Sequence, residues 1–217
     1  MNENKEYRNY ELERYEEIGD FIDKILNKID EGFNSLPDKY HPADLGKENA
    51  ILLYSLIREH RPETVVETGV CNGLSSSVIL KALKDNDKGR LVSVDLPAKA
   101  GSDDISEERT GAVIPPYKES GWVVPNHLRS RWTLNIGDTF KRTPAILNKL
   151  GAIDIFIHDS DHSYEGMMFE FSLAWRYLKE SGYLLADNID MSDAFDHFAE
   201  GKELKKYRLG KMGLFKK

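Results

Sequence analysis

Residues 64–95, TVVETGVCNGLSSSVILKALKDNDKGRLVSVD, decide the fold class of this chain. Two short runs of β-branched and apolar residues, Thr64–Glu67 and Leu91–Asp95, predict strands that are buried on both faces. Between them, a turn with two glycines leads into Ser75–Lys84, which has a helical pattern. Since a helix joins the two strands, we expect a parallel pair with a right-handed crossover.

The same alternation continues through the rest of the chain. Apolar runs predict further strands at Trp132–Ile136, Ile153–His158 and Tyr183–Asp187, and helical patterns lie at Thr139–Leu150, Ser163–Glu180 and around Ser192–Glu200. Two last strands, Lys205–Leu209 and Gly213–Lys216, are separated by about three residues and must form an antiparallel hairpin. We therefore predict an α/β protein with a doubly wound, mostly parallel sheet.

A predicted N-terminal helical extension, residues 1–46, precedes the domain at residues 47–217. Apolar residues from Leu12 to Phe33 recur every three or four positions, and Lys47–His60 carries a second amphipathic pattern. These helices pack on the sheet of their own chain, cover its site or form a contact between two copies. A homo-oligomer is therefore one of the arrangements that we consider.

Residues 97–126 interrupt the alternation, because they are rich in proline, glycine and polar residues and have little apolar periodicity. An insertion of this length in a compact domain usually has a purpose. It carries Tyr117, Trp122 and Val123, so we interpret it as a loop that covers the substrate. A surface insertion without such a role is the alternative.

Length and composition limit the classes of protein to consider. The 217 residues, 40% hydrophobic and 31% charged, fit one soluble globular domain with a short extension and contain no stretch apolar enough to span a bilayer. A net charge of −7 argues against a nucleic-acid partner. The start of the chain lacks a signal-peptide pattern and the single Cys71 cannot form an internal disulfide, so we expect a cytoplasmic protein. We interpret the basic residues 202–217 as solvated surface, with a binding patch as the alternative.

Ligands of open α/β sheets bind beyond the carboxyl ends of the strands, so the residues that end each strand are informative. The first strand ends in Glu67 and a turn in which Gly69 and Gly73 permit close approach of a ligand, before a helix that begins near Ser75. The second ends at Asp95, whose carboxylate can accept hydrogen bonds from both hydroxyls of a ribose. The turn lacks the G-x-G-x-x-G pattern of dinucleotide sites, but NAD and other adenosine cofactors would both use Asp95.

Acidic residues also follow the later strands. After the third strand, Gly137 precedes Asp138, which either caps the next helix or holds an adenine amino group. Asp159, Asp187 and Asn188 follow the fourth and fifth strands, and their oxygens would suit a hard divalent cation such as Mg²⁺. The alternative is that these residues serve only as helix caps and turn formers.

His162 lies three residues after Asp159, which would place its imidazole next to a cation held there. A histidine with a pKa of about 6–7 can remove a proton from a hydroxyl near neutral pH. We therefore predict that His162 is a general base. His158 and Asp161 are the nearby alternatives, and the simpler interpretation of His158 is a buried residue at a strand end.

This ordered set of residues resembles the class I S-adenosylmethionine-dependent methyltransferases. More narrowly, it is similar to the small-molecule O-methyltransferases that include the catechol, caffeoyl-CoA and macrolide-sugar enzymes. The resemblance covers about residues 47–217 and rests on Glu67-Thr-Gly69-x-x-x-Gly73, Asp95, Gly137-Asp138, Asp159-Ser-Asp161-His162-x-Tyr164 and Asp187-Asn188. It implies a Rossmann-like sheet of seven strands in the order 3-2-1-4-5-7-6, with strand 7 antiparallel.

The resemblance also implies roles for single residues. Glu67, Gly69 and Gly73 would surround the methionine part of the cofactor, Asp95 would bind its ribose and Asp138 its adenine, and Ser75, Gly137 and Asp159 complete the predicted cofactor-binding set. Asp159, Asp187 and Asn188 match metal ligands. Two departures are that Cys71 replaces a glycine of the wider pattern and that His162 stands where catechol-type enzymes have a lysine base.

The function predicted from the sequence is transfer of a methyl group from S-adenosylmethionine to a hydroxyl of a small-molecule acceptor, assisted by a divalent metal. His162 and Asp159 are the predicted catalytic residues. An NAD-binding oxidoreductase and a non-catalytic S-adenosylmethionine-binding protein are the alternatives. The acceptor itself stays open, because its walls would come from the insertion and the N-terminal helices.

Overall fold

The computed structural model describes the chain except for residues 1–2, 41, 43–44 and 102–112, and for some side chains near the N-terminus and that of Leu209. The chain forms two compact units. One comprises Met1–Arg61, Val70–Lys88 and Pro97–Trp132, and the other Pro62–Gly69, Gly89–Leu96 and Thr133–Lys217. The predicted division between residues 46 and 47 stays a prediction.

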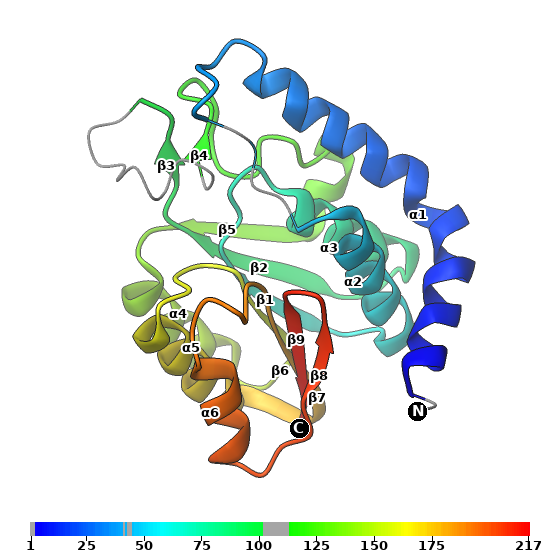
Figure 1. The fold of residues 1–217 in the computed structure, drawn as a ribbon, viewed down its shortest axis with the longest axis vertical. Helices are drawn as coiled ribbons and strands as arrows, with labels where there is room; N and C mark the ends of the chain where they lie inside the picture. The colour runs from blue at the N-terminus through cyan, green and yellow to red at the C-terminus, as the bar shows by residue number, and fades with distance from the viewer. Residues whose placement is uncertain (1–2, 41, 43–44, 102–112) are drawn as a thin grey trace. The chain divides into compact units, whose positions relative to one another are not determined.

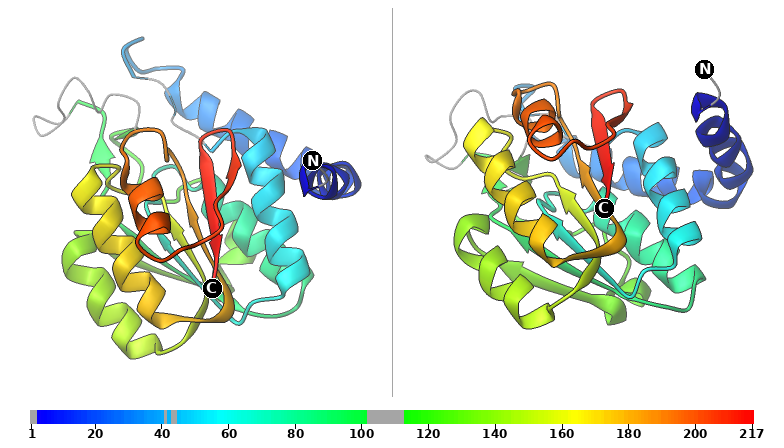
Figure 2. Two further views of the ribbon diagram at one scale, coloured as in Figure 1. Left: turned by 60° about the horizontal axis from the view of Figure 1, so that its bottom comes forward. Right: turned by 90° about the horizontal axis from the view of Figure 1, so that it is seen from below.

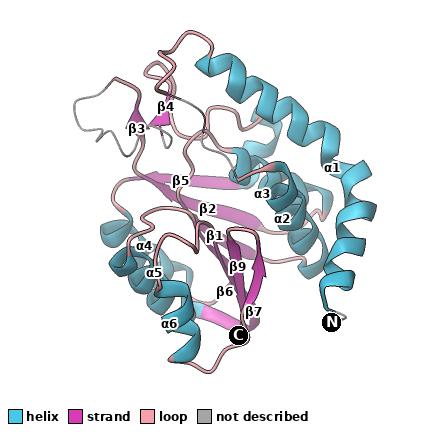
Figure 3. Ribbon diagram, in the orientation of Figure 1, coloured by secondary structure: helices cyan, strands magenta, loops and turns pink. Residues whose placement is uncertain are grey.

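A seven-stranded sheet lies in the second unit (Figure 1). Its strands are β1 (Thr64–Thr68), β2 (Arg90–Asp95), β5 (Trp132–Ile136), β6 (Ile153–His158), β7 (Leu178–Ala186), β8 (Tyr207–Leu209) and β9 (Met212–Lys216). The one residue of these strands outside that unit is Trp132, the first residue of β5. They lie in the order β5-β2-β1-β6-β7-β9-β8, with β9 antiparallel to both of its neighbours and β1 parallel to β2 and β6. This arrangement confirms the predicted fold class, strand order and terminal hairpin (Figure 3).

Three helices cover one face of this sheet: α4 (Thr139–Leu150), α5 (Tyr164–Tyr177) and α6 (Ala194–Glu200) (Figure 2). Their apolar sides share one buried cluster with the strands, in which Phe171 of α5 and Phe156 of β6 are fully buried. Phe195 of α6 stacks on Phe215 of β9 with ring centroids 4.2 Å apart. Gly213 makes this contact close, because a Cβ there would lie 2.3 Å from the Phe195 ring.

The boundary between α5 and β7 differs from the sequence prediction. The predicted helix extends to residue 180, whereas α5 ends at Tyr177 and β7 begins at Leu178. The extended chain is fixed by the backbone of Gly182, whose carbonyl accepts a hydrogen bond from Lys217 N at 2.9 Å. A Cβ at Gly182 would lie 2.8 Å from the Asp154 carbonyl oxygen, so this strand fits only without a side chain there.

The first unit is mainly helical, with α1 (Glu3–Phe33), α2 (Lys47–His60), α3 (Leu74–Asp85), the two-residue strands β3 (Ala98–Lys99) and β4 (Val113–Ile114), and a 3₁₀ helix at Asn126–Arg131. Ile18, Ile22 and Ile29 of α1 are buried, as the predicted amphipathic pattern requires. Lys47 donates a hydrogen bond of 2.6 Å to Asp23 between α2 and α1. Among the described residues, no helix has the length and apolar character needed to cross a membrane.

The described part of the 97–126 insertion is held by hydrogen bonds within the first unit. The Tyr117 hydroxyl donates to the Gly32 carbonyl at 3.0 Å, and Trp122 Nε1 donates to Asn72 Oδ1 at 2.8 Å. Val123 is fully buried, whereas Tyr117 is 61% exposed. Residues 102–112 lie outside the described part, and a covering role of the insertion stays a prediction.

Candidate active site

Four acidic residues lie at the carboxyl ends of neighbouring strands of the second unit. Glu67 is the second-last residue of β1 and Asp95 the last residue of β2, and they are 0% and 6% exposed. Asp159 and Asp187 follow β6 and β7 directly. Backbone hydrogen bonds tie these ends together, because Asp159 N donates to the Thr68 carbonyl and Asp187 N to the His158 carbonyl, both at 2.9 Å.

The β1 and β2 ends have well-defined partners. The buried carboxylate of Glu67 accepts a hydrogen bond of 2.7 Å from the Ser93 hydroxyl. The carbonyl of Asp95 accepts one of 2.8 Å from Gly137 N, which brings the end of β5 beside the end of β2. Asp138 is the N-cap of α4, since its side chain accepts a hydrogen bond from Lys141 N. The capping role is therefore present, and a contact with adenine stays a prediction.

Gly69 is the point where the turns after β1 and β6 touch. It has a φ of +83°, and a Cβ at this position would lie 1.7 Å from the carbonyl oxygen of Asp159. Only glycine combines this left-handed backbone with so close an approach. The sequence predicted close approach of a ligand here, and the structure adds close approach of the neighbouring turn.

The charged forms of both carboxyls that follow β6 and β7 are destabilised. Burial, followed by the negative charges of Asp187 and Glu67, raises the pKa of Asp159 well above its ordinary value. Burial also raises the pKa of Asp187, although the backbone N–H of Asn188 opposes the shift. The charged form of Asp159 is therefore disfavoured at these strand ends, while the positive charge of Lys211 also opposes the shift at Asp187.

His162 lies beside these carboxylates. Its Nε2 is 3.2 Å from Asn188 Nδ2 and 3.8 Å from Asp159 Oδ1, and its side chain is 18% exposed. The expected pKa of about 6–7 is wrong for this geometry, because burial and the nearby His158 lower the pKa of His162 to about 4. The imidazole is therefore neutral at pH 7 in this structure, a state that can accept a proton.

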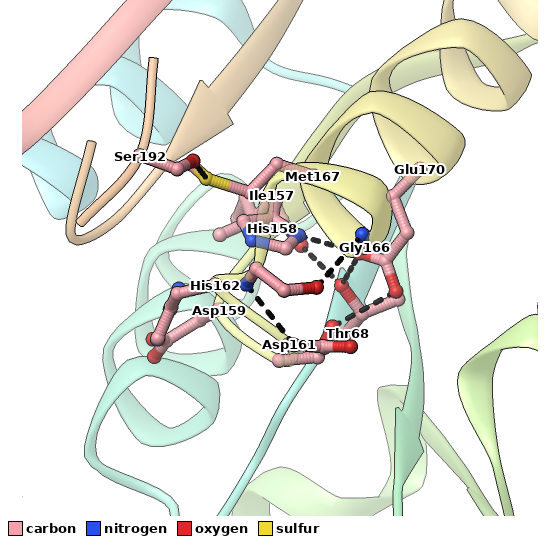
Figure 4. Close-up of polar contacts among 12 residues, drawn as sticks. Thr68, Ile157, His158, Asp159, Asp161, His162, Gly166, Met167, Glu170 and Ser192 are labelled. Carbon is pink, nitrogen blue, oxygen red and sulfur yellow. Dashed lines mark hydrogen bonds and ion pairs between the residues drawn. The ribbon is translucent and has the colours of Figure 1, made fainter. Parts of the chain in front are cut away.

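A buried network behind this site was not predicted from the sequence (Figure 4). Glu170 of α5 is 1% exposed and His158 is fully buried, with His158 Nδ1 2.7 Å from Glu170 Oε2. The Thr68 hydroxyl donates to the same oxygen at 2.5 Å, and the Ser160 hydroxyl to Glu170 Oε1 at 2.8 Å. The sequence feature that could have indicated this network is Glu170 itself, an acid on the apolar side of a predicted helix, next to Phe171.

Gly73 and Ser75 belong to the first unit. Gly73 has a φ of +102° and immediately precedes α3, and Ser75 is buried in its first turn. A Cβ at Gly73 would lie 2.7 Å from Gly121 Cα, so the glycine permits close packing of the insertion. A role of either residue at the cofactor stays a prediction.

The predicted metal ligands are only partly brought together. Within the described ranges, no three histidine, cysteine or acidic side chains are arranged as a metal-binding group. Asp159 and Asp187 interact electrostatically, while the Asn188 amide nitrogen faces His162. The set of two carboxylates and one amide nevertheless has the oxygen donors that a hard cation prefers.

Comparison with known proteins gives one family match. The model of a family described as a methyltransferase domain matches residues 66–189, more than half of the chain. No curated protein matches the sequence.

Several solved structures share the fold. A methyltransferase from Geobacter sulfurreducens is 18% identical, with a TM-score of 0.60 and 93% of this chain and 95% of that chain covered. An O-methyltransferase from Bacillus cereus in complex with SAH is 14% identical, with a TM-score of 0.57 and 90% of each chain covered. The O-methyltransferase TomG from Streptomyces achromogenes, in complex with SAM and involved in tomaymycin synthesis, is 16% identical, with a TM-score of 0.59 and 88% of each chain covered. At these identities the likeness concerns the fold.

Proposed function

Because the chain belongs to the methyltransferase-domain family, we propose that it transfers a methyl group from S-adenosylmethionine to a hydroxyl of a small-molecule acceptor, assisted by a divalent cation such as Mg²⁺. The observation that carries this proposal is the row of Glu67, Asp95, Asp159 and Asp187 at the carboxyl edge of the sheet. This edge is where open α/β sheets bind their ligands.

The cofactor would lie along β1, β2 and β5. Glu67 offers a carboxylate to the cationic end of the cofactor, and Asp95 can accept hydrogen bonds from ribose hydroxyls. Leu96, which directly follows β2, and Ile136, which ends the neighbouring strand β5, are 64% and 49% exposed and offer an apolar surface for a base. The SAM in TomG and the SAH in the Bacillus cereus enzyme support this choice of cofactor.

The cation would be held by Asp159, Asp187 and Asn188. Burial raises the pKa of both carboxyls and the charge of Asp187 adds to the shift at Asp159, so a bound cation would favour both charged forms. Two carboxylates and one amide also offer the oxygen donors that a hard divalent ion prefers. Such an ion, when bound, makes a coordinated hydroxyl more acidic.

In the proposed reaction the chain mainly orients the two reactants. The bond between the sulfonium sulfur and the methyl carbon breaks as the bond from the acceptor oxygen to that carbon forms, in line with the leaving sulfur. His162 Nε2 would take the hydroxyl proton, and Asp159, 3.8 Å away, would stabilise the resulting imidazolium. The pKa of about 4 in the ligand-free site keeps His162 unprotonated until the acceptor arrives.

The acceptor would have an apolar body beside its hydroxyl. Met191 and Tyr164 are 65% and 39% exposed, although they are large apolar or aromatic residues. Met191 lies one turn beyond Asn188, whose carbonyl accepts a hydrogen bond from Met191 N at 3.1 Å, and Tyr164 lies two residues after His162. Exposed apolar side chains next to a polar site favour phenols over free sugars as acceptors.

The proposal is tested by calorimetric titration of the purified protein with S-adenosylmethionine, S-adenosylhomocysteine and NAD. Transfer of labelled methyl groups to a panel of phenols, diols and sugars follows, with Mg²⁺ or with a chelator. We expect binding of both adenosyl ligands, and loss of that binding in Asp95→Ala but not in Asp154→Ala, which changes an acid at the opposite end of the sheet. Binding of NAD alone would contradict the proposal, and cofactor binding without turnover of any acceptor would favour a non-catalytic role.

A further inference from the structure

The buried carboxylate of Glu170 lies at the junction of three segments. It accepts hydrogen bonds from Thr68 at the end of β1, from His158 at the end of β6 and from Ser160 in the turn that follows β6. Figure 4 shows Glu170 reaching from α5 toward Thr68 and His158. Burial alone would raise the pKa of Glu170, but the hydrogen bonds from His158, Thr68 and Ser160 outweigh it and keep the pKa low. The group is therefore an ionised acceptor of three hydrogen bonds.

The turn that donates one of these hydrogen bonds through Ser160, residues 159–162, carries the predicted catalytic residues. On one side it touches Gly69, where a Cβ would lie 1.7 Å from the Asp159 carbonyl oxygen. On the other side it touches Gly166 in the first turn of α5, where a Cβ would lie 2.5 Å from the Asp161 carbonyl oxygen. The turn is thus enclosed by two glycines, and the hydrogen bond from the Ser160 side chain to Glu170 links it to α5.

Glu170 also orients the His158 ring. A carboxylate can only accept, so His158 Nδ1 must donate. The buried Nε2 atom on the other side of the ring has no hydrogen-bond partner among the described residues. The His158 ring lies edge to face with the ring of His162, with centroids 5.4 Å apart. The orientation of His158 therefore limits where His162 can lie.

We propose that Glu170 is a positioning residue, which fixes the turn at residues 159–162 and the His162 ring through Ser160 and His158. The inference about catalysis rests on the proposed function, whereas the inference about the turn does not. Glu170 itself is buried below the site and would touch neither cofactor nor acceptor.

A matched control exists at the other end of the same strands. Asp154, near the start of β6, accepts hydrogen bonds from the backbone N–H groups of Thr64 at 2.9 Å and Glu63 at 3.1 Å, and from Lys179 at 2.9 Å. It therefore ties the start of β6 to the start of β1 with two hydrogen bonds and to β7 with a third. Like Glu170 it accepts three hydrogen bonds, but it does so at the amino ends of the strands. A variant at Asp154 reports the effect of losing such a tie away from the site.

The first measurement is hydrogen exchange of the full chain, followed by mass spectrometry of the peptide that covers residues 159–163. We expect exchange of this peptide to become at least tenfold faster in Glu170→Ala and in the milder Ser160→Ala. Asp154→Ala should leave it unchanged. Equal exchange in all variants, or protection lost in Asp154→Ala as much as in Ser160→Ala, would overturn the inference. This readout needs no turnover, so it stands if the proposed function fails.

The second measurement separates positioning from general stability. Glu170→Gln can keep all three contacts, because its amide oxygen accepts from Thr68 and His158 while its NH₂ group donates to a rotated Ser160 hydroxyl. We expect its kcat to stay within about threefold of the wild type, whereas Ser160→Ala and Glu170→Ala lose tenfold or more, as a displacement of about 1 Å can cause. The Kd for S-adenosylmethionine should change less than kcat. A Gln variant as slow as the Ala variant would overturn a positioning role.

Discussion

Replacement of Gly69 by alanine tests whether the turns after β1 and β6 depend on a missing side chain. The new methyl carbon would lie 1.7 Å from the Asp159 carbonyl oxygen, whereas ordinary contact begins at 3.4 Å, so the turns must separate by about 1.7 Å along that line. A left-handed backbone costs a non-glycine residue roughly 1–2 kcal/mol, and overpacking adds roughly 1–3 kcal/mol. We expect Gly69→Ala to lower the free energy of unfolding by about 2–5 kcal/mol.

The control is Gly210→Ala. Gly210 also has a positive φ, of +56°, but nothing lies within 4 Å of its added Cβ. It should therefore show only the backbone cost of about 1–2 kcal/mol. Urea denaturation followed by circular dichroism gives both values, and calorimetry gives the affinity for S-adenosylmethionine, which only Gly69→Ala should reduce. Equal destabilisation by the two substitutions would refute the contact between the turns.

Three further predictions concern charge and burial. In ligand-free protein with chelator, the free energy of unfolding should fall as the pH rises through the raised pKa of Asp159. Asp159→Asn should therefore stabilise the protein at pH 7 by about 1 kcal/mol, which raises Tm by a few degrees, and an unchanged Tm would contradict this. Lys179 and two backbone N–H groups keep the pKa of Asp154 low despite its burial, so the stability that Asp154 contributes should be present at neutral pH and lost as the pH falls through that pKa. In thermal melts across pH, Asp154→Asn should lower the free energy of unfolding by about 0.5–1 kcal/mol at pH 7 and leave it unchanged in strong acid. The buried Thr143 hydroxyl has no hydrogen-bond partner among the described residues, so Thr143→Val should leave stability unchanged or raise it by about 1 kcal/mol in urea denaturation, and a large loss would reveal a missed partner.

Much of the sheet could be predicted because buried parallel strands leave a local signal. The run Ile153–His158 is a strand with the predicted bounds, and Thr139–Leu150 is a helix with the predicted bounds. The end of α5 was missed, because Lys179 and Glu180 favour helix locally while pairing of Leu178 with Ile153 favours strand. The short strands β3 and β4 carry too few residues for any periodic pattern.

The candidate site was predictable to the level of strand ends. The rule that ligands bind at those ends identified Asp95, Asp159 and Asp187 without knowledge of their contacts. It could not give the low pKa of His162, because burial depends on the packing of distant segments. It also missed Glu170, whose partners are 10, 12 and 102 residues away in the sequence. Such a network becomes visible only when the chain is folded.

The placement of β9 between β7 and β8 affects how the protein is made. During synthesis, Tyr183–Ala186 of β7 leaves the ribosome well before its antiparallel partner Gly213–Lys216. Until then one side of β7 offers unpaired backbone groups, which can pair with a strand of another nascent chain. Premature termination before β9 would leave this edge permanently uncovered and Phe195 without its stacking partner. Incomplete translation products should therefore aggregate or require chaperones.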